Sequence, residues 1–154
     1  MVLPNAVPTC FIELLAAHAA QRGSRLAIID RDRRLTYAAL HEQSRALAAG
    51  LTSIGVRPGD RVAVWLPNSL AWMVTFLACA RLGALVLAVN TRFRAHELED
   101  IIARGKVDWL VMWPSFKNIP FAEILEGVTP LSLERLRGIV CYEEEHTVPS
   151  SVSD

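Results

Sequence analysis

The chain has 154 residues, 52% of them hydrophobic and 21% charged, which suits one soluble globular domain with a packed core. Sixteen basic residues balance sixteen acidic ones, so the charge gives no reason to expect a nucleic acid or an anionic membrane as partner. Three widely separated cysteines argue against a CxxC metal motif and against a disulfide framework, and they favour a reducing, cytoplasmic location.

The first third of the chain predicts a helix, a hairpin and a second helix. The first helix covers residues 9–21, with Thr9 as its cap. A short apolar strand over 26–30 is followed by a polar turn and a return through Leu35-Thr36-Tyr37, which indicates a hairpin. Thr36 then caps a helix that ends at Gly55. The apolar faces are formed by Phe11, Leu14, Leu15 and His18 in the first helix, and by Leu40, Ser44, Leu47, Leu51 and Ile54 in the second.

Strands then alternate with helices to the end of the patterned sequence. This alternation predicts an α/β fold, with a largely parallel sheet flanked by helices. We expect residues 1–142 to form the domain and residues 143–154, which are polar and lack apolar periodicity, to be a disordered tail. The predicted strands are 61–66, 85–89, 107–113 and 138–142, and the predicted helices are 69–83 (capped by Asn68 or Ser69), 94–105, 121–126 and 131–137.

The stretch 69–89 is nearly all apolar and about as long as a membrane span. Arg81 and Gly83 interrupt it, and Gly83 stands where a helix C-cap falls, so we favour a buried helix, a turn and a strand over a membrane-spanning helix. The large side chains nearby, Trp65, Trp72, Met73 and Phe76, are expected in the core, although a hydrophobic acid would also pack against them.

No motif in the sequence nominates a catalytic or metal-binding residue. The eight glycines are dispersed, and neither a Walker-type phosphate loop nor a dinucleotide fingerprint is present. The four histidines do not stand at metal-ligand spacing with one another or with a cysteine. The sequence contains no nucleophile-elbow motif.

Two polar loops are the candidate binding elements, because each follows a predicted parallel strand at its carboxyl end, where such sheets bind ligands. They are residues 67–69 and 90–92. In the second loop and just beyond it, Asn90, Thr91, Arg92 and Arg94 carry donors suited to a phosphate group. The alternative, a plain turn with solvated arginines, is the commoner arrangement of such residues.

Three segments together resemble the N-terminal part of the AMP-forming acyl-CoA synthetases, members of the acyl-adenylate-forming (ANL) superfamily. They are Leu35-Thr36-Tyr37-Ala38-Ala39-Leu40, Gly59-Asp60-Arg61-Val62-Ala63 and the run from Leu82-Gly83-Ala84 to Asn90-Thr91-Arg92. The form of the last segment is similar to that of the fatty- or aromatic-acid–CoA ligase branch. The resemblance covers about residues 9–142 and implies an incomplete N-terminal subdomain of the synthetase fold.

The resemblance implies a reaction in which a carboxylic acid, ATP and coenzyme A give acyl-CoA, AMP and pyrophosphate, with Mg²⁺, as in fatty acid metabolism. The family's phosphate loop and catalytic lysine belong to later parts of its sequence. We therefore expect a truncated acyl-CoA synthetase, inactive and without cofactors when alone, or one part of a split enzyme completed by a C-terminal polypeptide. The resemblance further places Asn90, Thr91, Arg92 and Arg94 near coenzyme A, with no catalytic and no metal-binding residue in this chain.

Two alternatives of other classes stay open at this point. One is a non-catalytic module that retains the fold and binds coenzyme A or another protein, including a second copy of itself. Exposed sheet edges and uncovered apolar helices would favour such self-association. The other is a membrane protein that uses residues 69–89.

Overall fold

The computed structural model of the chain describes residues 10–142, so the expected cap Thr9 and the expected tail 143–154 lie outside the described residues. The α/β class predicted from the sequence is confirmed. The elements are α1 (Phe11–Arg22), β1 (Leu26–Asp30), β2 (Arg33–Thr36), α2 (Tyr37–Ser53), β3 (Arg61–Trp65), α3 (Leu70–Leu82), β4 (Leu85–Ala88), α4 (Ala95–Gly105), β5 (Trp109–Met112), α5 (Phe121–Glu126), α6 (Pro130–Leu133) and β6 (Gly138–Cys141).

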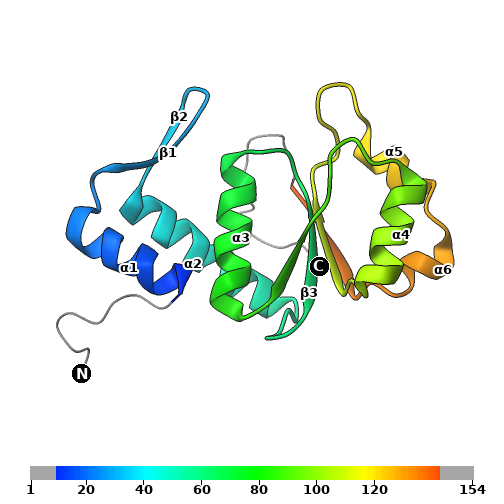
Figure 1. Cartoon of the computed structure of the whole chain (residues 1–154), viewed down its shortest axis with the longest axis horizontal. Coiled ribbons are helices and arrows are strands. Elements are labelled where there is room, and N and C mark those ends of the chain that lie inside the picture. The colour runs from blue at the N-terminus through cyan, green and yellow to red at the C-terminus, as the bar shows by residue number, and fades with distance from the viewer. Residues whose placement is uncertain (1–9, 143–154) are drawn as a thin grey trace.

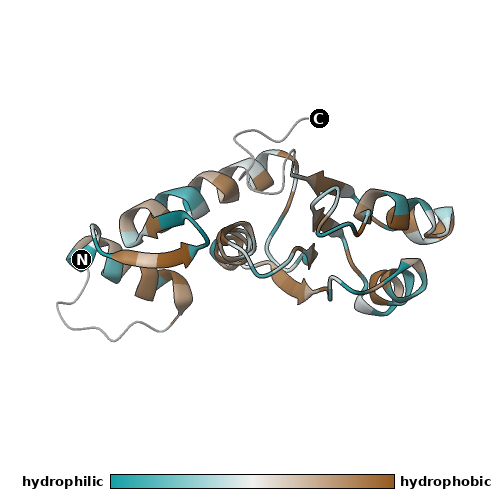
Figure 2. Ribbon diagram, turned by 90° about the horizontal axis from the view of Figure 1, so that it is seen from above, coloured by the Kyte–Doolittle hydropathy of each residue, from teal (hydrophilic) through white to brown (hydrophobic). Residues whose placement is uncertain are grey.

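The four later strands form a parallel sheet in the order β4-β3-β5-β6, and β1 pairs with β2 in a separate antiparallel hairpin. Helix α3 lies on one side of the sheet, and α4, α5 and α6 lie on the other (Figure 1). Viewed from above, helices flank the largely hydrophobic strands on both sides (Figure 2). Parallel strands need such crossover helices, which bury both faces of the sheet.

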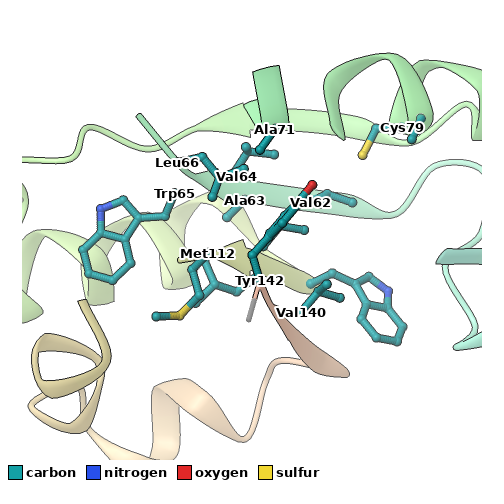
Figure 3. Close-up of a cluster of buried hydrophobic side chains, with 14 of the residues drawn as sticks. Val62, Ala63, Val64, Trp65, Leu66, Ala71, Cys79, Met112, Val140 and Tyr142 are labelled. Atoms are coloured by element: carbon teal, nitrogen blue, oxygen red, sulfur yellow. The ribbon is translucent and has the colours of Figure 1, made fainter. Parts of the chain in front are cut away.

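The core is centred on β3, in which Val62, Ala63, Val64 and Trp65 have no exposed surface (Figure 3). Consecutive strand residues point to opposite faces, so β3 is covered from both sides. On one face the Trp65 ring stacks on Phe121, with 4.3 Å between centroids. On the α3 side the hydroxyl groups of Tyr142 and Thr75 share a hydrogen bond of 2.6 Å. Burial raises the pKa of Tyr142, which keeps this phenol neutral.

Three predicted helix ends are confirmed by their hydrogen bonds or backbone geometry. The Thr36 hydroxyl accepts from the Ala39 N–H at 3.2 Å, and the Ser69 hydroxyl accepts from the Trp72 N–H at the same distance. Gly83 ends α3 in the left-handed region, with φ of 70°. The stretch 69–89 is therefore a helix, a turn and a strand, and no helix among the described residues is long and apolar enough to cross a membrane.

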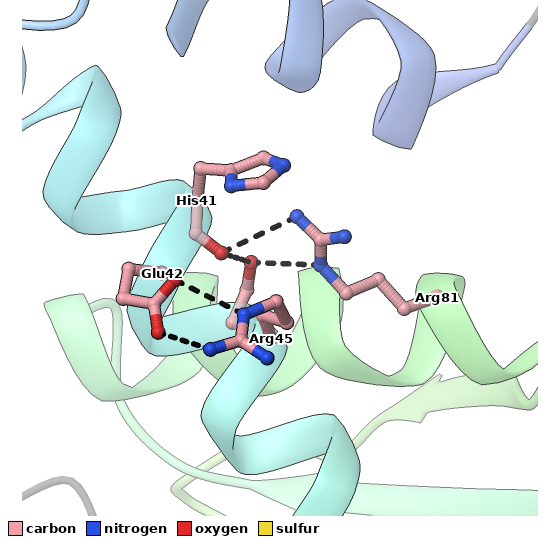
Figure 4. A network of polar contacts seen from close by, with 5 residues as sticks. His41, Glu42, Arg45 and Arg81 are labelled. Atoms are coloured by element: carbon pink, nitrogen blue, oxygen red, sulfur yellow. Dashed lines mark hydrogen bonds and ion pairs between the residues drawn. The ribbon is translucent and has the colours of Figure 1, made fainter.

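A polar contact joins α2 to α3 within this apolar packing (Figure 4). The Arg81 guanidinium donates to the buried Ser44 hydroxyl at 3.1 Å and to the His41 carbonyl at 3.3 Å. Burial, and then the charge of Arg81, lower the pKa of His41. Ser44 lies in the core-facing stripe expected for α2, and its hydroxyl can be buried there because it is hydrogen-bonded.

Two expectations about apolar faces are wrong. In α1 only Leu15 is buried, whereas Phe11 is 64% exposed and Leu14 is 43% exposed. In α3 the side chains of Trp72 and Phe76 are only half-buried, although they pack against the core. The physical reason is that the contacts of α1 with α2 and α3 bury Leu15 but leave Phe11 at the start of the helix with an edge contact to the half-buried Phe76, 5.5 Å between ring centroids.

The amino end of the sheet is held by Asp60, which precedes β3. Its Oδ2 accepts hydrogen bonds from the Arg57 N–H at 2.8 Å, from Trp109 Nε1 at 3.1 Å and from Arg137 Nη1 at 2.8 Å. The Arg137 guanidinium also lies over the Trp109 ring, 5.3 Å from its centroid. One carboxylate therefore joins the turn before β3 to β5 and to the residue before β6.

We expect Asp60→Asn to lower the free energy of unfolding by about 1–3 kcal/mol, because an amide oxygen accepts these bonds without the negative charge that faces Arg137. Urea unfolding followed by circular dichroism measures the change. Asp32→Asn, at an exposed position in the β1–β2 turn, is the control and should leave the midpoint unchanged. Equal midpoints for Asp60→Asn and the native chain would contradict this role.

Candidate functional site

A cleft of about 660 Å³ lies at the carboxyl ends of β3 and β4. Its volume falls within the range of about 300–1,000 Å³ that is usual for small-molecule sites. Both loops singled out in the sequence contribute to it, which matches the rule that open parallel sheets bind ligands at this end. The lining residues are Arg31, Leu66, Pro67, Asn68, Trp72, Ala88, Val89, Asn90, Thr91, Phe116 and Lys117.

The loop after β4 is fixed by hydrogen bonds around Asn90. The Asn90 carbonyl accepts from Trp65 Nε1 at 3.2 Å and from the Phe93 N–H at 3.0 Å. The Asn90 side-chain oxygen accepts from the Arg92 N–H at 2.9 Å, which closes an Asx turn. This turn uses the acceptor of the side chain and leaves its amide N–H groups as donors beside the cleft.

The structure separates the four candidate residues of this loop into two pairs. Asn90 and Thr91 line the cleft, whereas Arg92 and Arg94 are exposed and are not among the lining residues. The Arg94 guanidinium folds back to donate to the carbonyls of Arg92 and Phe93. The Arg94 N–H donates to Glu97 at 3.0 Å, and this bond lowers the pKa of the Glu97 carboxyl. Arg94 therefore supports the loop and the start of α4.

Two cationic lining residues, Arg31 and Lys117, were not expected from the sequence. Arg31 lies in the two-residue turn between β1 and β2, and Lys117 lies in a second tight turn, between Phe116 and Ile119. In the sequence both belong to polar turns, where a cation usually signals only solvent exposure. Their backbones are left-handed, with φ of 57° at Arg31 and 46° at Lys117. The sequence does contain a signal for the two turns, because Asp32 and Asn118, next to Arg31 and Lys117, are typical residues of two-residue hairpin turns.

Aromatic side chains form the apolar part of the cleft. Trp72 lines it and stacks on Phe76, with 5.6 Å between centroids and 10° between the ring planes. On the other rim the Lys117 ammonium lies 5.3 Å from the centre of the Phe116 ring. This arrangement can hold a flat or apolar group next to an anionic one.

The described residues hold no group of three or more metal-ligating side chains, and the cleft lining contains no cysteine, serine or histidine. Cys79, the one cysteine within the sheet–helix core, is fully buried, and its burial raises the pKa of its thiol to about 12. It lies apart from the cleft lining. The chemistry that the cleft supports is binding through cations, amide donors and aromatic rings.

Comparisons of this chain with known proteins agree on one family. A sequence model for the family described as AMP-binding enzyme matches residues 15–151. The chain is 42% identical over 109 residues to a methyl-dioxo-octahydroindenyl-propanoyl:CoA ligase of Rhodococcus jostii, covering 71% of this chain and 21% of the relative. It is 37% identical over 128 residues to the mitochondrial medium-chain acyl-CoA ligase of Mus musculus, covering 82% of this chain and 21% of the relative.

The chain thus spans about a fifth of the length of these curated relatives. Among solved structures it is similar to the N-terminal domain of FACL13 from Mycobacterium tuberculosis, with a TM-score of 0.77 and 24% identity. That match covers 86% of this chain and 33% of the other. At this level of identity it supports the fold alone.

Alkylation of the buried Cys79 thiol tests whether α3 packs against the core as described. In the variant Cys10→Ser/Cys141→Ser, iodoacetamide at pH 8 should not modify the folded chain, because the thiolate is the reactive form and a pKa of about 12 leaves almost none of it. Unfolding in urea should allow complete labelling, measured by mass spectrometry. Labelling of the folded variant at the rate of the unfolded one would show that α3 does not pack as described.

Proposed function

The chain belongs to the AMP-binding enzyme family, and on this basis we propose that it supplies the N-terminal part of the adenylate-forming domain of an acyl-CoA ligase. In the proposed reaction of the complete enzyme, a carboxylic acid reacts with Mg-ATP to give an acyl-adenylate and pyrophosphate. Attack by the coenzyme A thiol then yields acyl-CoA and AMP. The observation that carries the proposal is the match of residues 15–151 to the family, together with similarity to ligases that form CoA thioesters.

The part of the reaction that these 154 residues can perform is limited by their side chains. The sequence has no Ser/Thr/Gly-rich phosphate loop, and the described residues hold no group of three or more His, Cys, Asp or Glu side chains that could bind the metal of Mg-ATP. We therefore propose that these residues alone do not form an adenylate. Adenylation would need further segments, whether they lie on the same polypeptide or on a second one.

In this proposal, the chain contributes ligand binding at the carboxyl end of the sheet. Asn90 and Thr91 on the cleft wall, with the exposed Arg92 and Arg94 beside them, would contact coenzyme A. Arginine suits this task because its planar guanidinium makes paired, charge-assisted hydrogen bonds to phosphate oxygens. The loop is held by the Asn90 hydrogen bonds to Trp65 and Phe93, so these donors are ordered before a ligand arrives.

A second candidate is a non-catalytic module that binds coenzyme A or pairs with another polypeptide. It is favoured by the open outer edges of β4 and β6 within the described sheet, where Leu85 is 54% exposed and Ile139 is 43% exposed. Sedimentation of the chain as a single monomeric species would argue against the pairing. A cytoplasmic location stays a prediction, since the mouse relative is mitochondrial.

The activity of the isolated chain tests the catalytic part of the proposal. We expect the 154-residue protein to show no ATP–pyrophosphate exchange above background with fatty and aromatic carboxylic acids, because its sequence has no Ser/Thr/Gly-rich loop to hold the phosphates of ATP while charge develops at the α-phosphate. A full-length acyl-CoA ligase serves as positive control. Exchange by the chain alone would overturn this part and leave the family assignment intact.

Titration calorimetry with coenzyme A tests the binding part. We expect saturable binding that weakens about tenfold in Arg92→Ala, the energetic equivalent of one charge-assisted hydrogen bond. Arg94→Ala should weaken it less, because the Arg94 guanidinium is engaged with the carbonyls of its own loop. Arg57→Ala, an exposed arginine at the amino end of the sheet, is the matched control. Binding unchanged in the Arg92 and Arg94 variants would contradict the coenzyme A contact.

A further inference from the structure

We propose that Trp65 is a positioning residue for the loop after β4, and that its indole couples this loop to the segment that follows β5. Both segments line the cleft, through Asn90 and Thr91 in the first and through Phe116 and Lys117 in the second. The inference rests on the proposed function only in naming coenzyme A as the ligand whose affinity depends on the coupling.

The indole N–H is the only polar group of the Trp65 side chain, and it is bonded to the loop. Trp65 is the last residue of β3 and has no exposed surface (Figure 3). Its Nε1 donates to the Asn90 carbonyl at 3.2 Å. Because a buried donor without an acceptor is costly, this bond holds the Asn90 carbonyl within reach of the strand.

The same residue, Asn90, organises the rest of the turn. Its carbonyl also accepts from the Phe93 N–H at 3.0 Å, and its side-chain oxygen accepts from the Arg92 N–H at 2.9 Å. Asn90 and Arg92 are exposed, so burial of their side chains contributes little order to the turn. Together with the partly buried Phe93, the hydrogen bond from Trp65 therefore ties an exposed turn to the core.

The orientation of the Trp65 ring depends on Phe121, the first residue of α5. The two rings are stacked, with 4.3 Å between centroids and 18° between their planes, and neither has exposed surface. Packing of this density restricts the indole to one orientation. A change at Phe121 therefore alters how well the indole N–H points at the Asn90 carbonyl.

Phe121 also stands at the base of the second segment of the cleft. After β5 the chain makes a tight turn over 116–119 before α5 begins. The Ala122 N–H donates to the Pro114 carbonyl at 3.0 Å, which closes this segment beside Phe121. The stack of Phe121 on Trp65 thus joins the base of the turn to the loop after β4, so that the two segments are ordered together.

Hydrogen exchange of the 154-residue chain under native conditions tests the positioning role without a ligand. Trp65→Phe keeps an aromatic ring and removes the N–H, so the Arg92 and Phe93 amides should exchange about fivefold faster, the equivalent of one neutral hydrogen bond. Trp109→Phe is the matched control, because Trp109 is also buried but donates to Asp60 at the amino end of the sheet. It should leave both amides unchanged, even where it lowers the global stability more.

The variant Phe121→Leu tests the coupling. We expect it to reduce the protection of the Trp65 indole N–H and to speed exchange of the Arg92 amide by part of the same factor. In the Trp65→Phe background it should change the Arg92 amide no further, since the bond that transmits the effect is already absent. An effect of equal size in both backgrounds would show that Phe121 reaches the loop by another route and would overturn the coupling.

Titration with coenzyme A separates this inference from the proposed function. If the native chain binds coenzyme A, Trp65→Phe should weaken the affinity about fivefold and Trp109→Phe should not, because a disordered loop must be ordered at the expense of binding. Equal affinity of the native and Trp65→Phe chains would overturn the effect on the ligand. If the native chain does not bind, the coenzyme A contact fails, and the exchange rates still test Trp65.

Two results would overturn the positioning role whatever the titration gives. One is unchanged exchange of the Arg92 and Phe93 amides in a folded Trp65→Phe chain. The other is an unprotected Trp65 indole N–H in the native chain, a measurement that holds even if Trp65→Phe does not fold.

Discussion

The arrangement of the molecule follows from the complete burial of β3. Four consecutive residues of this strand, Val62 to Trp65, have no exposed surface, and their side chains alternate between the two faces of the sheet. Both faces must therefore be covered, which the helices on the two sides of the sheet achieve. Because β3 and β4 run parallel, their following loops meet at one end of the sheet. The cleft lies there as a consequence of this topology.

The two ends of the sheet are built from opposite chemistry. At the amino end, two carboxylates accept hydrogen bonds that hold the sheet together. Asp60 accepts from Arg57, Trp109 and Arg137. Asp108 accepts from the Arg61 N–H at 2.8 Å. At the carboxyl end the cleft presents cations and amide groups and no carboxylate. This division matches the general separation of stability and binding between the two ends of parallel sheets.

Much of the fold could be predicted because the sequence marks it locally. The strand 61–66, the caps Thr36 and Ser69 and the stop at Gly83 all depend on neighbouring residues, and the structure has them where expected. The helix predicted over 131–137 ends at Leu133 instead, since the Arg137 N–H bonds to the distant Asp108 carbonyl. A contact of this kind has no signature in the local sequence.

The candidate site was predictable only in part for the same reason. Asn90 and Thr91 follow a predicted strand, and the structure brings them into the cleft. Arg31 and Lys117 lie 86 positions apart in sequence and line the same cleft only through the tertiary fold. Trp72 shows the converse problem: an apolar helix pattern predicts burial, but this side chain is only half-buried in the structure. Hydropathy specifies which residues prefer the interior, and it does not reveal which of them lack a neighbour to cover them.

The contact between Asp60 and Arg137 spans 77 positions and has a consequence for synthesis of the protein. On the ribosome, the turn before β3 emerges long before its partner arginine is made. During that interval the nascent chain carries an uncovered run of valine, alanine and tryptophan, since β5 and β6 do not yet exist to accompany it. Long-range pairing of this kind slows folding and leaves apolar segments open to aggregation. Until β5 and β6 have left the exit tunnel, β3 therefore lacks the partner strands and helices that bury its two faces.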